Sequence, residues 1–264
     1  MVTKEELKQQ IAAMGVTPAD TVVLHTSMKA IGEVEGGPDG LLDAFCEYLS
    51  DGLLVVPTHT WDVVTPENPY YDVRTTVPNI GLIPRVAAFR RDGVRSLHPT
   101  HSLWARGSDA EEFVRGEEDA PTPTSVGFCW DKLADRHAKI LLIGVGNEKN
   151  TFIHAVDERA KLPDRISKTY YELTITDHNG KTITRPQYPL ECSKTEDISW
   201  FYGNFEKPMV ETGVQTYGKL GDAPVGIVDA MGCRQLLMEI YSRATEDIFA
   251  QKIDLPEWLY EAYC

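Results

Sequence analysis

The sequence has no apolar run as long as the roughly 20 residues that a membrane span requires. Its opening residues, Met1 to Glu6, also lack the apolar segment that a signal peptide carries. It contains no internal repeat, no tract of low complexity and no stretch with the composition of a linker. These absences predict a single domain over residues 1–264 that works in the cytoplasm without membrane contact.

The sequence has few cysteines, and their spacing suggests no pairs. The five cysteines are scattered, odd in number and never spaced as C-x-x-C: Cys46, Cys129, Cys192, Cys233 and Cys264. A disulfide framework or a zinc knuckle would need regular pairs, so neither is expected. We expect free thiols.

Basic residues are also in short supply, with 26 against 40 acidic ones and a formal charge of −14. Such a charge repels nucleic acid phosphates, so nucleic acid is not an expected partner. It favours cationic ligands such as polyamine-like substrates. Many proteins are acidic for solubility alone, so the charge supports a cationic substrate without establishing one.

Apolar strands alternate with helical periodicity through the first 150 residues. Continuous apolar runs at Thr21–His25, Leu53–Pro57 and Lys139–Gly146 predict buried strands. Helical spacing predicts helices at 4–14, 38–49 and 80–92. Strands that are apolar throughout are typical of a sheet covered on both faces, so we expect an α/β fold with a central mixed, largely parallel sheet flanked by helices.

The pattern changes after residue 168. Tyr170–Thr176 and Lys181–Thr184 flank the turn signal Asp177–Gly180, which predicts a projecting β-hairpin at about residues 169–186. The chain then returns to a strand at 224–228 and a helix at Asp229–Ala244, with Asp229 placed to cap that helix.

The first candidate site is the loop from His25 to Gly32, which follows a strand and leads to a helix. Small and hydroxyl residues there let backbone N–H groups approach a phosphate. The loop matches neither G-x-G-x-x-G nor Walker A, so an ordinary β-α loop is the alternative. Lys29 either pairs with phosphate or is simply solvated.

The second candidate site is the segment Arg95–Ser102, in which His98 and His101 share a loop with two serines and a threonine. This density of donors suggests ligand contact, although the histidines could equally hold the loop together. A metal site would need a third ligand from His25, His59 or His154.

The third candidate site is the glycine-rich exit of the strand at 139–146, which leads to a helix carrying His154. Ligands in open α/β sheets gather at the carboxyl ends of strands. Asp157 and Glu158 follow at i+3 and i+4, so either carboxylate could orient the imidazole. Neutral imidazole can take a proton from an amine near pH 7, while a plain surface pair is the alternative.

These segments together resemble the antibiotic N-acetyltransferase family, which contains the aminoglycoside 3-N-acetyltransferases and has an α/β fold distinct from the GNAT fold. The resemblance covers nearly the whole chain and rests on four segments in this order: Val23–Gly32, Val56–Thr60, Arg95–Ser102 and Asn150–His154 with the acids that follow. It implies acetyl-CoA as donor, no metal, direct transfer to the 3-amino group of a 2-deoxystreptamine aminoglycoside, and a role in antibiotic resistance.

The resemblance also assigns residues. The family's catalytic histidine falls on His154, and its acid falls on Asp157, where the family commonly has glutamate; Glu158 lies beside it. Cofactor contacts are expected from the following residues: Ser27, Met28, Lys29, Ala30, Gly32, His98, Thr100, His101, Ser102 and Ser125. An oxyanion-stabilising group is expected among backbone N–H groups or a hydroxyl near Ser102.

Substrate contacts are expected from acidic and aromatic residues near these segments. The expected residues are His59, Trp61, Asp62, Glu148, Asp157 and Glu158. Residues 191–217 should shape the acceptor cleft, and the aromatic residues there are expected mostly in the core: Trp200, Phe201, Tyr202 and Phe205.

Three other functions are consistent with these residues. One is an acyltransferase acting on an amine that is not an antibiotic. Another is a metal-dependent hydrolase using His98, His101 and a distant histidine with Asp157 or Glu158, although H-E-x-x-H is missing. The third is a sensor that binds CoA or carbohydrate. The expected partner is an aminoglycoside or another polycationic amine, and the assembly could be a homodimer.

Overall fold

The computed structural model describes residues 1–193 and 195–243, so the expected helix end at Ala244 and Cys264 lie outside the described residues. Its seven-stranded sheet has the order β4-β5-β2-β1-β6-β10-β9, and a three-stranded sheet has the order β3-β7-β8. The strands are β1 (Thr21–Thr26), β2 (Leu53–Pro57), β3 (Tyr70–Asp72), β4 (Val94–Arg95), β5 (Leu103–Gly107), β6 (Lys139–Ile143), β7 (Tyr171–Thr176), β8 (Thr182–Gln187), β9 (Gln215–Leu220) and β10 (Ala223–Asp229).

Helices connect most of these strands. The α-helices are α1 (Lys4–Ala13), α2 (Met28–Ile31), α3 (Gly37–Tyr48), α4 (Leu82–Ala87), α5 (Ala110–Val114), α6 (Cys129–Asp135), α7 (Phe152–Arg159), α8 (Glu206–Glu211) and α9 (Ala230–Arg243). Three 3-10 helices complete the described chain: η1 (Glu117–Asp119), η2 (Asn147–Lys149) and η3 (Ile198–Phe205).

Within the main sheet, parallel pairing is confined to the centre. Val23 on β1 pairs with Val55 on β2 and with Ile140 on β6, both in parallel register. The outer strands β5, β4, β10 and β9 all pair antiparallel. The predicted mixed sheet is confirmed, but the expectation that it is largely parallel is wrong, because only its β2–β1 and β1–β6 pairings are parallel.

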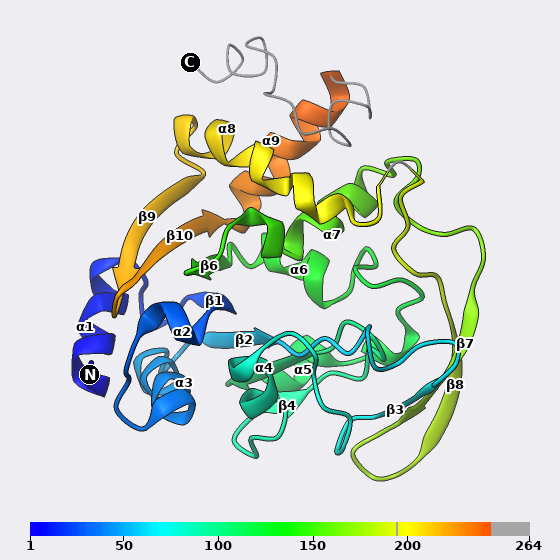
Figure 1. Cartoon of the computed structure of the whole chain (residues 1–264), viewed down its shortest axis with the longest axis horizontal. Coiled ribbons are helices and arrows are strands. Elements are labelled where there is room, and N and C mark those ends of the chain that lie inside the picture. The colour runs from blue at the N-terminus through cyan, green and yellow to red at the C-terminus, as the bar shows by residue number, and fades with distance from the viewer. Residues whose placement is uncertain (194, 244–264) are drawn as a thin grey trace.

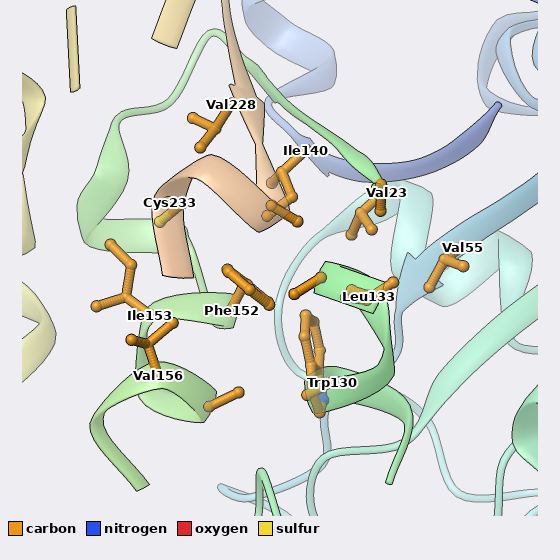
Figure 2. Close-up of a cluster of buried hydrophobic side chains, with 14 of the residues drawn as sticks. Val23, Val55, Trp130, Leu133, Ile140, Phe152, Ile153, Val156, Val228 and Cys233 are labelled. Atoms are coloured by element: carbon orange, nitrogen blue, oxygen red, sulfur yellow. The ribbon is translucent and has the colours of Figure 1, made fainter. Parts of the chain in front are cut away.

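Successive strand residues point to opposite faces of the sheet, and each face has its own core. On one face Val23 and Ile140 pack with Trp130 and Phe152 under α6, α7 and α9 (Figure 2). On the other face the alternate residues, such as Leu24, pack against α1, α3 and α4. Figure 1 shows these helix groups on opposite sides of the sheet. Burial on both faces is why these strands are apolar throughout.

The predicted hairpin projects to one side of the main sheet and pairs with β3 in a second sheet (Figure 1). Its own small core is formed by Val64, Tyr71, Val73, Leu173 and Ile175. Hydrogen bonds fasten this sheet to the main body. The Tyr71 hydroxyl donates to the Ser96 carbonyl at 3.0 Å, and Arg95 Nη1 donates to the Thr76 carbonyl at 2.7 Å.

Two expected element boundaries are corrected. The helix expected at 80–92 is wrong in length, because α4 ends at Ala87 and the chain turns so that Arg90 reaches Asp43 and Asp92. The strand expected to run to Gly146 ends at Ile143, because Gly144 adopts a φ of 65°. The expected cap is confirmed, since the Gly232 N–H donates to Asp229 Oδ1 at 2.5 Å.

The described cysteines, Cys46, Cys129, Cys192 and Cys233, are all free thiols, as expected. Among the helices of residues 1–193 and 195–243, none is both long and apolar enough to cross a membrane.

Replacing Gly144 with alanine should lower the free energy of unfolding by several kcal/mol. A Cβ there would lie 2.3 Å from the Cβ of Ala30, so α2 would have to move. Overpacking of this kind typically costs about 1–3 kcal/mol, beyond roughly 1 kcal/mol for the positive φ. Urea denaturation of Gly144→Ala measures the sum.

Gly116→Ala is the matched control, because Gly116 also has a positive φ of 84° but no atom within 4 Å of the added Cβ. Its free energy of unfolding should fall only by the cost of placing alanine at a positive φ. Equal losses in the two variants would show that the contact with Ala30 contributes nothing.

Candidate active site

The carboxyl ends of the three parallel strands open into a cleft of about 900 Å³. β1 contributes His25 and Thr26, the residue pair after β2 contributes His59, and the segment after β6 leads through η2 to α7. Parallel strands end at the same sheet edge, so three separate segments of the sequence meet here. The cleft is therefore built by the part of the sheet that the apolar runs predicted.

Histidine rings gather beside Trp130 at the base of this cleft. The ring centroids of His59 and His101 are 4.6 Å apart, and those of His59 and Trp130 are 5.6 Å apart. Burial lowers the pKa of His25 to about 3 and lowers the pKa values of His59 and His101 well below 6.5. These imidazoles are neutral at pH 7. The Nε2 atoms of His25 and His59 are buried without a hydrogen-bond partner from the described protein.

His98 holds its own loop. Its Nδ1 accepts the backbone N–H groups of Thr100 at 3.2 Å and His101 at 3.0 Å, and its Nε2 lies 2.9 Å from the Thr122 carbonyl. Because Nδ1 accepts, the proton is on Nε2, which donates to Thr122. Burial lowers the pKa of His98 to about 4. This ring organises the loop and turns Thr100 and His101 toward the cleft.

Ser102 is fully buried beside Arg95. Its hydroxyl donates to the Thr58 carbonyl at 2.8 Å and accepts from Arg95 Nε at 3.2 Å. Arg95 also donates to the Thr58 carbonyl at 3.1 Å. The Ser102 hydroxyl thus fixes the segment after β2, on which His59 lies.

The first turn of α7 carries His154 into the cleft wall. Phe152, Ile153 and Val156 on the same helix are buried in the core, which fixes the direction of the helix. The Nδ1 atom of His154 lies in a 2.8 Å hydrogen bond with the hydroxyl of Tyr202 on η3. Burial lowers the pKa of His154, against an opposing effect from the charge of Asp157. A neutral imidazole at the cleft surface is a suitable proton acceptor.

The two acids after His154 point in different directions. Asp157 is 2% exposed and accepts hydrogen bonds from the hydroxyls of Tyr202 at 2.6 Å and Tyr241 at 2.5 Å. Glu158 accepts instead from Thr122 at 2.5 Å and Thr124 at 3.0 Å. We expected one acid to hold the imidazole directly, whereas the structure places the Tyr202 hydroxyl between Asp157 and His154 and turns Glu158 away.

Four of the six residues expected to contact substrate line the cleft: His59, Trp61, Asp62 and Glu148. Asp157 and Glu158 do not line it, because their side chains hydrogen-bond groups away from it. The segment 191–217, which was expected to shape the cleft, contributes lining residues from its first part, among them Glu191, Glu196, Asp197 and Trp200. Trp61 and Trp200 are 51% and 57% exposed, so large aromatic surface is available at the cleft for a ligand. The cleft therefore combines carboxylates with two open indole rings.

Only some of the residues expected to contact the cofactor line the cleft. Thr100 and His101 line the cleft. The other eight do not line it, and they lie in or beside α2, in the loop before β5 or before α6: Ser27, Met28, Lys29, Ala30, Gly32, His98, Ser102 and Ser125. Ser125 is buried and hydrogen-bonds Thr122, and Lys29 is exposed on α2.

The sequence analysis assigned no polar role to Tyr202, one of the aromatic residues expected mostly in the core. It is 2% exposed, as expected of a core residue, but its hydroxyl contacts both His154 and Asp157. A buried tyrosine usually has a hydrogen-bond partner, and that general rule was the available signal. The partner itself lies 48 residues away in the sequence and could not be read from it.

Metal binding has no support in the geometry. Within residues 1–193 and 195–243, no group of three or more His, Cys, Asp or Glu side chains is placed to hold a metal ion. His98 and His101 do not share a ligand site, because both nitrogens of His98 are engaged by the loop.

A neutral imidazole in a carboxylate-lined cleft at the carboxyl edge of an α/β sheet is an arrangement typical of an enzyme active site. The chain matches the family described as Aminoglycoside 3-N-acetyltransferase over residues 23–242. The chain belongs to this family. The family match confirms the prediction of an N-acetyltransferase.

Individual relatives agree with this assignment. The chain is 25% identical over 245 residues to aminoglycoside N(3)-acetyltransferase III of Serratia marcescens, covering 86% of this chain and 90% of the relative. It superposes on the aminoglycoside acetyltransferase AAC(3)-Xa with a TM-score of 0.76 at 25% identity, over 89% of this chain and 90% of that one. It superposes on AAC-IIIb, in a binary structure with CoASH, with a TM-score of 0.78 at 20% identity, over 92% and 99%. The predicted α/β fold, distinct from the GNAT fold, is confirmed.

Acidification below pH 6.5 should destabilise the protein before any carboxylate network is lost. An unfolded histidine binds a proton near pH 6.5, whereas folded His25 binds one only near pH 3. The unfolded state therefore holds more protons between these values, and each such histidine lowers stability by up to about 1.4 kcal/mol per pH unit. Urea denaturation between pH 7 and pH 4.5 measures the slope.

His25→Gln tests the origin of this slope, because glutamine does not titrate. The variant should show a shallower dependence on pH, by up to about 1.4 kcal/mol per unit below pH 6. An unchanged slope would mean that folded His25 is protonated in this range.

Proposed function

We propose that this chain transfers an acetyl group from acetyl-CoA to the 3-amino group of a 2-deoxystreptamine aminoglycoside, with His154 as the general base. The observation that carries the proposal is the neutral His154 at the surface of a carboxylate-lined cleft. Family membership supplies the reaction class, and the relative from Serratia marcescens bears the name of this activity.

The mechanism is a direct transfer in a complex of both substrates. The donor supplies an activated acetyl thioester. The amine nitrogen bonds to the acetyl carbon as the carbon–sulfur bond breaks, and His154 takes the proton that the amine loses. The sulfur leaves as thiolate, and the proton on His154 can neutralise it. Burial favours this sequence, because it keeps His154 neutral before the amine arrives.

The carboxylates of the cleft are proposed to bind the other ammonium groups of the acceptor. Asp62 and Glu148 face the cleft from the body of the protein, and Glu196 and Asp197 face it from the segment before η3. An aminoglycoside carries several positive charges, so negative charges on two sides can orient it. Trp61 and Trp200 offer apolar faces for the sugar rings.

The donor is proposed to enter along α2 and the loop before β5. Thr100 and His101 line the cleft, and Thr26 Oγ1 is a buried atom of the cleft wall without a described hydrogen-bond partner. The backbone at Ser27 lies at the start of α2. These groups suit a chain of amides that ends in a thioester, because such a chain needs isolated polar partners between apolar contacts.

We further propose that the chain acts as one domain in the cytoplasm. A homodimer stays a prediction, and so does the assignment of each cofactor contact. Asp157 is proposed to support His154 through Tyr202, and Glu158 to fix the loop at Thr122 and Thr124.

His154→Ala should lower kcat by about 100- to 10,000-fold, because the amine loses its proton acceptor. The assay follows free CoA thiol with acetyl-CoA and a panel of aminoglycosides, and calorimetry checks that the variant still binds CoA. Near-full turnover in the variant would exclude His154 as the base. Turnover by the wild type with other amines alone would move the acceptor to a different chemical class.

Removing one acidic charge from the cleft should weaken acceptor binding without slowing the chemical step. Asp62→Asn and Glu196→Gln should each raise KM for a polycationic acceptor up to about fivefold, the effect of one exposed ion pair, with kcat nearly unchanged. The increase should shrink as salt is added. Glu211→Gln, an exposed acid at the end of α8, is the control and should leave KM unchanged. A KM that stays constant in both cleft variants would remove these residues from the acceptor site.

A further inference from the structure

The hydroxyl of Tyr202 lies between the imidazole of His154 and the carboxylate of Asp157. Its oxygen is 2.8 Å from His154 Nδ1 and 2.6 Å from Asp157 Oδ2. Tyr202 and Asp157 are each only 2% exposed, so water does not compete for these contacts. The three groups form a chain of two short hydrogen bonds.

The carboxylate end of this chain is held as an acceptor. Asp157 accepts from the hydroxyl of Tyr241 at its Oδ1 atom, at 2.5 Å. Arg165 Nε lies 3.5 Å from its Oδ2 atom, and both partners are 2% exposed. Both oxygens of Asp157 thus accept a phenol hydroxyl, and a guanidinium, which can only donate, lies beside Oδ2.

The phenol has one proton, and the carboxylate determines where it goes. The Tyr202 hydroxyl donates to Asp157 Oδ2, as the Tyr241 hydroxyl does to Oδ1, so its single proton lies on the side of the carboxylate. Only lone pairs of the phenol oxygen then remain for His154, so Nδ1 must donate. A neutral imidazole has a single N–H, which leaves Nε2 unprotonated.

We propose that Tyr202 is a positioning residue that fixes the proton of His154 on Nδ1 and thereby makes Nε2 the basic nitrogen. Where it concerns turnover, this inference rests on the proposed function of His154. The amine proton goes to Nε2, while the Nδ1 proton and the phenol proton stay where they are. Asp157 stabilises the resulting imidazolium through the tyrosine hydroxyl rather than by direct contact.

The chain provides a matched pair of variants to test this. Tyr202→Phe and Tyr241→Phe each remove one buried hydroxyl that donates to Asp157, at Oδ2 and Oδ1 respectively. Tyr202→Phe also removes the partner of His154 Nδ1. A purely structural role for the hydroxyls predicts similar effects from both variants.

Two readouts separate a positioning role from a structural one. The first is the tautomer of His154 from the nitrogen-15 resonances of its ring, assigned by their loss in His154→Ala. The second is the division between kcat and KM in the thiol-release assay. Denaturation midpoints of both variants show whether they fold equally well.

We expect the wild type to hold the Nδ1–H form and Tyr202→Phe to shift toward the Nε2–H form. In Tyr202→Phe, kcat should fall at least about tenfold with KM within about twofold, since loss of an orienting partner can cost a general base up to about 10,000-fold. Tyr241→Phe should keep the Nδ1–H form and most of its kcat.

An Nε2–H tautomer in the wild type would overturn the inference, and this measurement needs no variant to fold. Equal kcat in the two phenylalanine variants, with unchanged tautomers, would also overturn it. A tautomer shift in Tyr202→Phe combined with no turnover by the wild type would support the hydrogen-bond chain and contradict the proposed function instead.

Discussion

Parallel pairing of three strands determines where everything else in the candidate site lies. β2, β1 and β6 are joined in register, from Val22 beside Leu54 and Lys139 to the strand ends. Their carboxyl ends therefore stop together, and the segments that continue from them carry His25, His59 and the approach to α7. The helices packed on both faces exclude water from these strands. The outer antiparallel strands widen the sheet without moving the carboxyl ends of the parallel strands.

Burial of polar groups gives the site its chemical character. Imidazoles next to Trp130 lose contact with water, so the neutral form is favoured and the rings act as uncharged donors and acceptors. A single carboxylate, Asp157, lies deeper in the protein with Arg165 and two phenols as its partners. Charge is thus kept below the surface on which His154 lies, while further carboxylates are placed at the cleft wall where solvent screens them.

Much of the architecture could be predicted because its signals are local. The apolar run at Leu53–Pro57, the turn at Asp177–Gly180 and the Asp229 cap all depend on a few neighbouring residues, and all three appear as expected. The antiparallel pairing of β5 with β2 and of β10 with β6 depends on contacts distant in sequence and was not predictable. The helix at 80–92 was overestimated because its apolar spacing continues after Ala87, where the ion pairs of Arg90 redirect the chain.

In the candidate site, too, features with a local sequence signal could be predicted and features that depend on distant contacts could not. His154 could be identified from its place after an apolar strand, and Asp157 could have been separated from Glu158 by the periodicity of α7. Ile153 is buried, and Asp157 lies four residues later on the same face, so its side chain had to point inward. Tyr202 offered no such pattern, because its contact with His154 arises only when η3 packs against η2 and α7.

The fastening of the small sheet has a consequence for how this protein can change over evolutionary time. Arg95 and Ser96 join β3 to the main sheet, and the His178 ring joins the hairpin turn to the Arg95 carbonyl at 2.9 Å. Tyr171 on β7 belongs to the cleft wall. Because this wall has a small core of its own, substitutions in the hairpin can reshape one side of the cleft while the strands that support His154 keep their packing. One wall of the cleft and the strands that support His154 are therefore encoded in parts of the sequence that can vary independently.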